Sequence, residues 1–193
     1  MPLYTDHISC QNQGSRNHRL LKNIARYLLL LLFIFTATNS YAQKPADYSV
    51  HANIIYHFTK YINWPAHRKS GDFIIGVVGE SFVYYALENS LSNKKVGDQK
   101  IVIKQFASAS FVTDCHILFL GDDESYAMNR IVEKTVSNNT LVVSESPGAA
   151  KKGSCINFVV IADRLKLEIN KQNIEKRKLN IASELLQLGK IVD

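Results

Sequence analysis

The sequence predicts an α/β sandwich: a mostly parallel sheet flanked by helices, with a C-terminal antiparallel hairpin. Between residues 50 and 144, short apolar runs alternate with segments of helical period, the pattern typical of parallel strands joined by helices. From residue 156 onward, two strand-like runs follow each other with only a short connection, which predicts a hairpin. The chain shows neither internal repeats nor an interdomain linker, so we expect one folded domain over residues 43–193.

Each element follows from its local pattern. Apolar side chains recur at helical spacing over residues 50–63, and Pro65 ends this helix because the residue before a proline is pushed out of the helical region. The sequence predicts four strands ahead of the hairpin, at residues 73–78, 100–106, 115–120 and 140–144, and further helices at residues 80–90 and 125–136.

The C-terminal part has a different pattern. Residues 156–162 and 165–170 form the predicted hairpin, linked by Asp163 and Arg164. In the second strand apolar and polar side chains alternate strictly, which predicts an edge strand with one solvated face. The chain is then expected to end in residues 179–181 and a helix over residues 183–192.

A signal peptide is predicted at residues 1–42. Four basic residues precede the apolar run 27–36 (YLLLLLFIFT), and the small-residue sequence Ser40-Tyr41-Ala42 follows it. The run is about half the roughly 20 residues of a membrane-spanning helix, so cleavage is favoured over anchoring. We therefore expect a mature protein in the periplasm, without membrane insertion after cleavage.

Charge and motifs exclude several function classes. The formal net charge is +6, spread along the chain, and its basic clusters, such as residues 176–178, lack the flanking aromatic side chains of a nucleic-acid site. No nucleotide-binding glycine motif, nucleophile elbow, HExxH or CxxC is present. We therefore predict no catalytic residues, cofactor, metal or nucleic acid, and no enzyme activity.

Two cysteines remain in the predicted domain, Cys115 and Cys155, each directly before an apolar run. In an oxidising compartment they could pair, if the two strands begin close together. Two separate buried thiols are the alternative.

The most distinctive segment is YHFTKYINWP, residues 56–65, which contains the only tryptophan, Trp64. Its aromatic side chains are large enough to anchor the helix in a core without any ligand. A partner-facing role is the alternative for Tyr56, His57 and Lys60.

Several segments together resemble the YfiR family of periplasmic proteins, in the order in which that family has them. They are the aromatic helix ending in Trp64-Pro65, then FIIGVVG (73–79), CHILFL (115–120), LVVSESPG (141–148), INF (156–158), LEIN (167–170) and SELLQLGKIV (183–192).

The resemblance implies an α/β sandwich that tends to dimerise and a regulatory role. YfiR-like proteins act on the periplasmic sensory domain of an inner-membrane diguanylate cyclase, and they restrain cyclic-di-GMP synthesis and biofilm formation. Under this hypothesis an exposed patch contacts the cyclase, with Tyr84, Tyr85 and the solvated side of strand 165–170 as further candidates.

A small-molecule-binding sensor module is the alternative function. Parallel sheets offer a crevice at the carboxyl ends of their strands. Here polar turns would border it, with Gly79, Ser81, Asp122 and Ser144 as the candidate residues for a small anion or an amino acid.

Overall fold

The computed structural model describes residues 26–27 and 48–193. The predicted signal peptide, except Arg26 and Tyr27, lies outside these residues. None of the helices in the described part of the chain is long and apolar enough to cross a membrane.

The described elements follow one another in an α/β order. They are α2 (Ser49–Tyr61), β1 (Ile62–Asn63), η1 (Ala66–Arg68), β2 (Phe73–Val78), α3 (Phe82–Leu91), β3 (Lys95–Val96), β4 (Gln99–Phe106), η2 (Ala109–Phe111), β5 (Ile117–Leu120), η3 (Asp122–Ala127), α4 (Met128–Thr135), β6 (Leu141–Ser144), η4 (Ala149–Lys152), β7 (Ile156–Ile161), β8 (Arg164–Ile169), α5 (Lys171–Lys176), β9 (Asn180–Ile181), α6 (Ser183–Leu186) and β10 (Lys190–Ile191).

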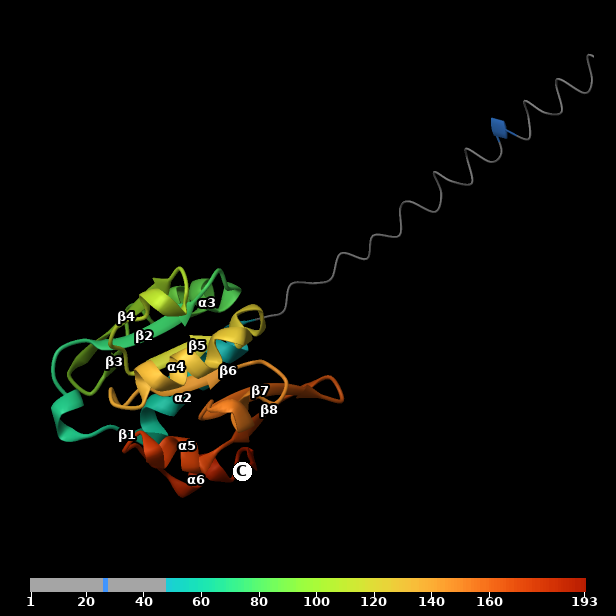
Figure 1. Ribbon diagram of the computed structural model, residues 1–193. Coiled ribbons are helices and arrows are strands. Elements are labelled where there is room, and N and C mark those ends of the chain that lie inside the picture. The colour runs from blue at the N-terminus through green and yellow to red at the C-terminus, as the bar shows by residue number, and fades with distance from the viewer. Residues whose placement is uncertain (1–25, 28–47) are drawn as a thin grey trace, which may run out of the picture. The chain divides into compact units, whose positions relative to one another are not determined.

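The main sheet of the described residues has the strand order β10-β8-β7-β6-β5-β2-β4-β3 (Figure 1). Strands β4, β2, β5, β6 and β7 are mutually parallel, whereas β8 is antiparallel to β7. The predicted fold class, a mostly parallel sheet with a C-terminal hairpin, is therefore confirmed.

The crossovers place helices on both faces of this sheet. The chain steps from β2 to β4 in one direction and then returns across β2 to β5, β6 and β7. Because parallel crossovers are right-handed, α3 covers one face, and η2, α4 and η4 cover the other. Helix α2 packs beside α3. The central strands are accordingly apolar on both sides, and β5 and β6 are buried throughout.

Three predictions about the C-terminal region are wrong. The predicted helix over residues 183–192 is shorter, since α6 ends at Leu186, and Gly189 packs closely against Ile169 ahead of β10. Strand β10 pairs with β8, so β8 is not the edge strand, although its alternating burial is as expected. The hairpin turn is formed by Ala162 and Asp163, both with positive φ, rather than by Asp163 and Arg164.

Arg177 also departs from the sequence analysis. Its basic neighbours Lys176 and Lys178 are exposed, but Arg177 is buried and donates to the backbone oxygens of Asn173 and Gly153. The backbone oxygen of Arg177 in turn accepts a hydrogen bond from the Asn139 amide group. Arg177 therefore ties α5 to the loops before β6 and β7 instead of contributing to a solvated basic face.

Candidate functional site

The carboxyl ends of β2, β5 and β6 meet at one edge of the sheet, where the sequence predicts a crevice. A cavity of about 280 Å³ lies there and contains Ser81 and Asp122 among its lining residues. Gly79 does not line the cavity but packs against Glu124, which does. A β-carbon at position 79 would lie 2.9 Å from the Glu124 side chain. The structure thus brings three of the four predicted crevice residues together.

Ser144, the fourth predicted residue, does not line this cavity. Its side chain is fully buried, with Oγ 2.8 Å from Ser154 Oγ and 2.7 Å from Asn157 Oδ1. Ser144 instead joins the end of β6 to the start of β7, a structural role.

The crevice is strongly acidic. Five carboxylate side chains line it and no lysine or arginine does; the five are Glu80, Asp122, Asp123, Glu124 and Glu145. Burial raises the pKa of Glu145 to about 7, and repulsion from Asp122 and Asp123 adds to this effect. The geometry therefore favours a cationic group over the small anion that the sequence analysis considered.

Glu145 connects the crevice to a second cavity of about 380 Å³ lined by both polar and apolar residues, with Tyr48 shared between the two. His51 lines this second cavity, and its Nε2 atom lies 3.7 Å from Glu145 Oε2. Burial raises the pKa of Tyr48, with further contributions from Glu145 and Asp123. Neither residue was singled out from the sequence: Glu145 lies within the segment LVVSESPG, where nothing marked its carboxylate, and Tyr48 belongs to no motif. In the described residues no group of three His, Cys, Asp or Glu side chains is placed to hold a metal ion.

The predicted partner-binding residues lie on the two neighbouring helices α2 and α3. Lys60 Nζ lies 5.4 Å from the Tyr56 ring centroid, and Lys94, just after α3, lies 4.4 Å from the same ring. His57 is exposed. On α3, Tyr84 is half-buried and contacts Tyr85 edge-on, whereas Tyr85 is 61% exposed.

Phe82, which was not among the residues singled out from the sequence, is a surface residue of α3. It is 69% exposed and lies one turn before Tyr85 on α3. Its ring stacks on Tyr48, with a centroid distance of 6.3 Å. Phe82 and Tyr85 therefore give α3 an aromatic outer face.

The possible disulfide between Cys115 and Cys155 is not formed: both are free, buried thiols. Cys115 precedes β5 and Cys155 precedes β7, and β6 lies between these strands. Two strand spacings are about 9.6 Å, well beyond the reach of a disulfide. Burial raises the pKa of Cys115 to about 12 and also raises the pKa of Cys155, so both remain protonated.

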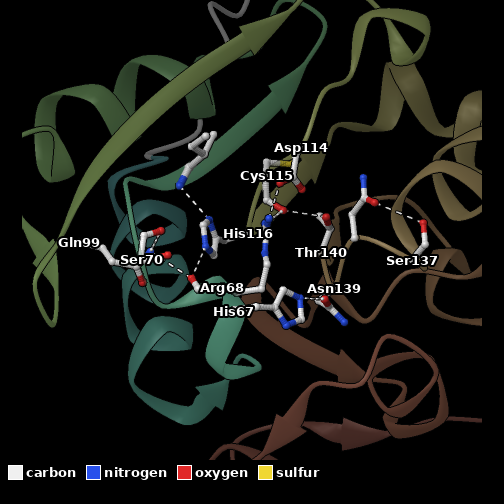
Figure 2. Close-up of polar contacts among 12 residues, drawn as sticks. His67, Arg68, Ser70, Gln99, Asp114, Cys115, His116, Ser137, Asn139 and Thr140 are labelled. Carbon is white, nitrogen blue, oxygen red and sulfur yellow. Dashed lines mark hydrogen bonds and ion pairs between the residues drawn. The ribbon is translucent and has the colours of Figure 1, made fainter.

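Polar contacts, from buried to exposed, join the loops at the opposite, amino-terminal edge of the sheet (Figure 2). Arg68 donates to Asp114 and to the backbone oxygen of Cys115, while the Thr140 hydroxyl donates to that same oxygen at 2.7 Å. His116 bridges the backbones of Ile74 and Arg68. Apart from the buried Nε of Arg68, which has no partner among the described residues, the side chains of this network are paired with one another or with the backbone, which indicates a structural role rather than a reactive site.

Comparison with known proteins supports both the fold and the family. Among solved structures, a conserved domain protein from Vibrio cholerae O1 biovar El Tor strain N16961 is similar, with a TM-score of 0.56 and 12% identity over 76% of this chain and 60% of that one. The chain thus spans less than two thirds of the length of that protein. The ABC domain from Streptococcus pneumonia in complex with L-Trp matches with a TM-score of 0.48 and 13% identity, over 62% of this chain and 56% of that one. A search of curated proteins finds no significant relative.

The family model described as YfiR/HmsC-like matches residues 48–190, which include every strand of the main sheet except the last residue of β10. The match covers well over half of the chain and agrees with the resemblance seen in its motifs. This chain belongs to the YfiR/HmsC-like family, whose members are periplasmic regulators in the cyclic-di-GMP pathway.

Proposed function

We propose that this protein is a periplasmic negative regulator that binds the sensory domain of an inner-membrane diguanylate cyclase and so restrains cyclic-di-GMP synthesis and biofilm formation. The family match over residues 48–190 is the observation that carries the proposal. Export through the predicted signal peptide and the absence of a recognisable catalytic motif in the sequence agree with it.

The aromatic outer face of α3, Phe82 and Tyr85, is the contact surface that we propose. Exposed aromatic side chains are costly in water and are enriched among the residues that dominate protein interfaces. The exposed side chains His57 and Lys60 of the neighbouring helix α2 would extend this surface, with Tyr56 and Tyr84 supporting it from half-buried positions.

Inhibition requires that the protein binds the inactive conformation of the cyclase more tightly than the active one. Shifting a two-state balance from 1:99 to 99:1 takes about 5.5 kcal/mol of differential affinity. An interface of standard size, about 1,600 Å², with a few aromatic anchors is sufficient for this. Homodimer formation, which the family resemblance implies, is part of the same proposal.

The experiment compares cellular cyclic-di-GMP in a deletion strain complemented with variants. The double variant Phe82→Ser and Tyr85→Ser should fail to lower cyclic-di-GMP, while the wild-type protein restores the low level. Phe111→Ser is the matched control, because Phe111 is 67% exposed but belongs to η2 on the other face of the sheet. Deletion without any change in cyclic-di-GMP would refute the regulatory role. Equal activity of the double variant would refute only the proposed surface.

A further inference from the structure

The β7–β8 hairpin extends beyond the strand that flanks it (Figure 1). Strand β6 pairs with β7 only at Ile156 and Asn157, whereas β8 pairs with β7 along its whole length, up to Ile161. From residue 158 onward, β7 therefore has one strand neighbour and one free edge among the described residues. We call the projecting part of the hairpin, residues 158–167, the hairpin arm.

The space beside the free edge is open to another strand. Strand β6 ends at Ser144 and is soon followed by Pro147, which has no N–H to donate to a neighbouring strand. In the described part of the chain no backbone hydrogen bond joins this loop to residues 158–161. A cavity of about 380 Å³ lies there instead, and Pro147, Phe158 and Val160 are among its lining residues.

The hairpin arm is apolar and exposed. Val160 is 71% exposed and Ile161 is 55% exposed. Val160 pairs with Leu165 and shares the face of Phe158, because side chains two residues apart lie on the same side of a strand. The Phe158 ring stacks on Phe58 of α2 with a centroid distance of 6.2 Å. The apolar face that α2 covers therefore continues onto the arm, where it reaches solvent.

The other edges of the sheet are protected against strand pairing. The outermost strands, β3 and β10, have only two residues each and carry Lys95 and Lys190. Strand β4, next to β3, carries Lys100 and Lys104. Short edge strands and lysines are usual means by which proteins prevent pairing between sheets. Residues 158–162 (FVVIA) contain neither a charge nor a proline, so the free edge of β7 is unprotected.

We propose that the free edge of β7 pairs with the same edge of a second copy of this chain, antiparallel and about a two-fold axis at Val160. Such an axis keeps each residue on its own face of the sheet, so Val160 lies opposite Val160, and Val159 lies opposite Ile161. These side chains are all β-branched and uncharged, so the pairing suits strand geometry and opposes no like charges. This interface belongs to the homodimer that is part of the proposed function, and it rests on that part alone, not on contact with the cyclase.

A second copy fits this edge better than a different protein does. Every copy carries the same unprotected edge, so an edge reserved for another protein would need a charge or a proline that prevents self-pairing. Residues 158–162 have none. Three paired positions on each copy bury less than the about 800 Å² per partner of a standard interface. We therefore expect a reversible dimer with a Kd in the micromolar range rather than an obligate one.

A cysteine at the two-fold axis tests the pairing directly. Opposite Cα atoms of antiparallel strands lie about 4.5–5.5 Å apart, within the roughly 4.4–6.8 Å that a disulfide spans. The full chain is used with Cys10 replaced by serine, since Cys115 and Cys155 are buried. Under mild oxidation, Val160→Cys should convert most of the protein to a covalent dimer. Phe111→Cys is the matched control and should stay monomeric, because Phe111 is 67% exposed but belongs to η2, outside the arm.

Sedimentation equilibrium measures the dimer without a cross-link. Val160→Lys sets two like charges opposite each other and should raise the Kd of the dimer at least about tenfold. Phe111→Lys adds the same charge elsewhere on the surface and should leave the Kd unchanged. Both side chains are largely exposed, so neither variant should lower the melting temperature, which is measured alongside.

A wild-type chain that stays monomeric up to about 0.5 mM would overturn the inference, as would a dimer whose Kd is the same in Val160→Lys. Equal yields of covalent dimer from Val160→Cys and Phe111→Cys would also overturn it. Cyclic-di-GMP in the deletion strain is scored separately. If deletion leaves it unchanged, the regulatory role fails, while a dimer that is weakened by Val160→Lys still supports this interface.

Discussion

The Nδ1 atom of His116 accepts a hydrogen bond from the backbone N–H of Ile74 at 3.1 Å. The other ring nitrogen, Nε2, lies 2.9 Å from the backbone oxygen of Arg68, so it must carry the proton and donate it. This arrangement needs a neutral imidazole, because a proton on Nδ1 would face the N–H of Ile74. His116 is also buried and stacks on Phe73 with a centroid distance of 4.4 Å.

The first prediction is that His116 makes stability fall at acidic pH. Burial lowers the pKa of His116 below the ordinary value of 6.5, so the unfolded state takes up its proton first. The contribution of His116 to the free energy of unfolding should therefore be fully present above about pH 6.5 and be lost as the pH falls below that value. Denaturant unfolding at pH 5, 6, 7 and 8 measures this, and His116→Gln should reduce the slope. His57→Gln is the control, since His57 is exposed; an unchanged slope in His116→Gln would contradict the prediction.

The second prediction concerns Glu145, whose pH dependence has the opposite sign. Its folded-state pKa of about 7 lies above the ordinary value of 4.5, because burial and then Asp122 and Asp123 disfavour the ionised form. The contribution of Glu145 to the free energy of unfolding is fully present below about pH 4.5 and is lost as the pH rises through 7. Glu145→Gln should therefore stabilise the protein at pH 8, by about 1 kcal/mol after allowance for solvent screening, and have little effect at pH 4.5.

The variant Asp123→Asn separates the two causes that raise the pKa of Glu145, burial and charge repulsion. It removes one repulsive charge but leaves Glu145 buried, so it should stabilise the protein at pH 8 by less than Glu145→Gln does. Thermal unfolding of both variants at the two pH values checks this order. Equal melting temperatures of Glu145→Gln and the wild type at pH 8 would show that Glu145 is not destabilising.

Local sequence patterns were sufficient to predict the parallel core. The runs at residues 73–78 and 141–144 are apolar at every position except Gly76 and Ser144, as expected for strands covered on both faces, and they form β2 and β6. The C-terminal segments were harder, because α6 and β10 depend on contacts with distant parts of the chain. Gly189, for example, lies against Ile169 of β8, a constraint that helical periodicity does not reveal.

Sites were less predictable than strands for the same reason. Gly79, Ser81 and Asp122 come together because carboxyl ends of parallel strands share one edge, a rule that needs only the parallel direction of the strands. The distance between Cys115 and Cys155 depends instead on the strand order, because β6 lies between the strands β5 and β7 that the two cysteines precede. That the buried Nε1–H of Trp64 has no hydrogen-bond partner among the described residues could not be foreseen at all, since pairing is a property of the folded surroundings.

The third prediction is that oxidation leaves the protein unchanged, because Cys115 and Cys155 are buried, protonated and separated by β6. With Cys10 of the predicted signal peptide replaced by serine, the native protein should react with a thiol reagent only very slowly, and both remaining thiols should react after unfolding. Treatment with a mild oxidant should not alter the melting temperature or the mass. A loss of two hydrogens in the mass of the folded monomer would contradict this.

The fourth prediction is that Gly153→Ala strongly destabilises the fold. Gly153 follows η4 with a φ of 122°, a conformation that residues with a side chain rarely adopt. A β-carbon there would also lie 2.3 Å from Val132 Cγ2 of helix α4. Strain and overpacking together should lower the free energy of unfolding by about 2–4 kcal/mol.

Gly97→Ala provides the matched control for this prediction. Gly97 has a φ of 58°, but a β-carbon there would meet nothing within 4 Å, so only the backbone strain of about 1 kcal/mol is expected. Denaturant unfolding of both variants tests this, because Gly153→Ala adds a more strained φ of 122° and the contact with Val132 to the loss expected at Gly97. If both variants lost the same stability, neither the extra backbone strain nor the packing of Gly153 against Val132 would contribute. The close approach of Gly153 to helix α4 would then be no constraint on the fold.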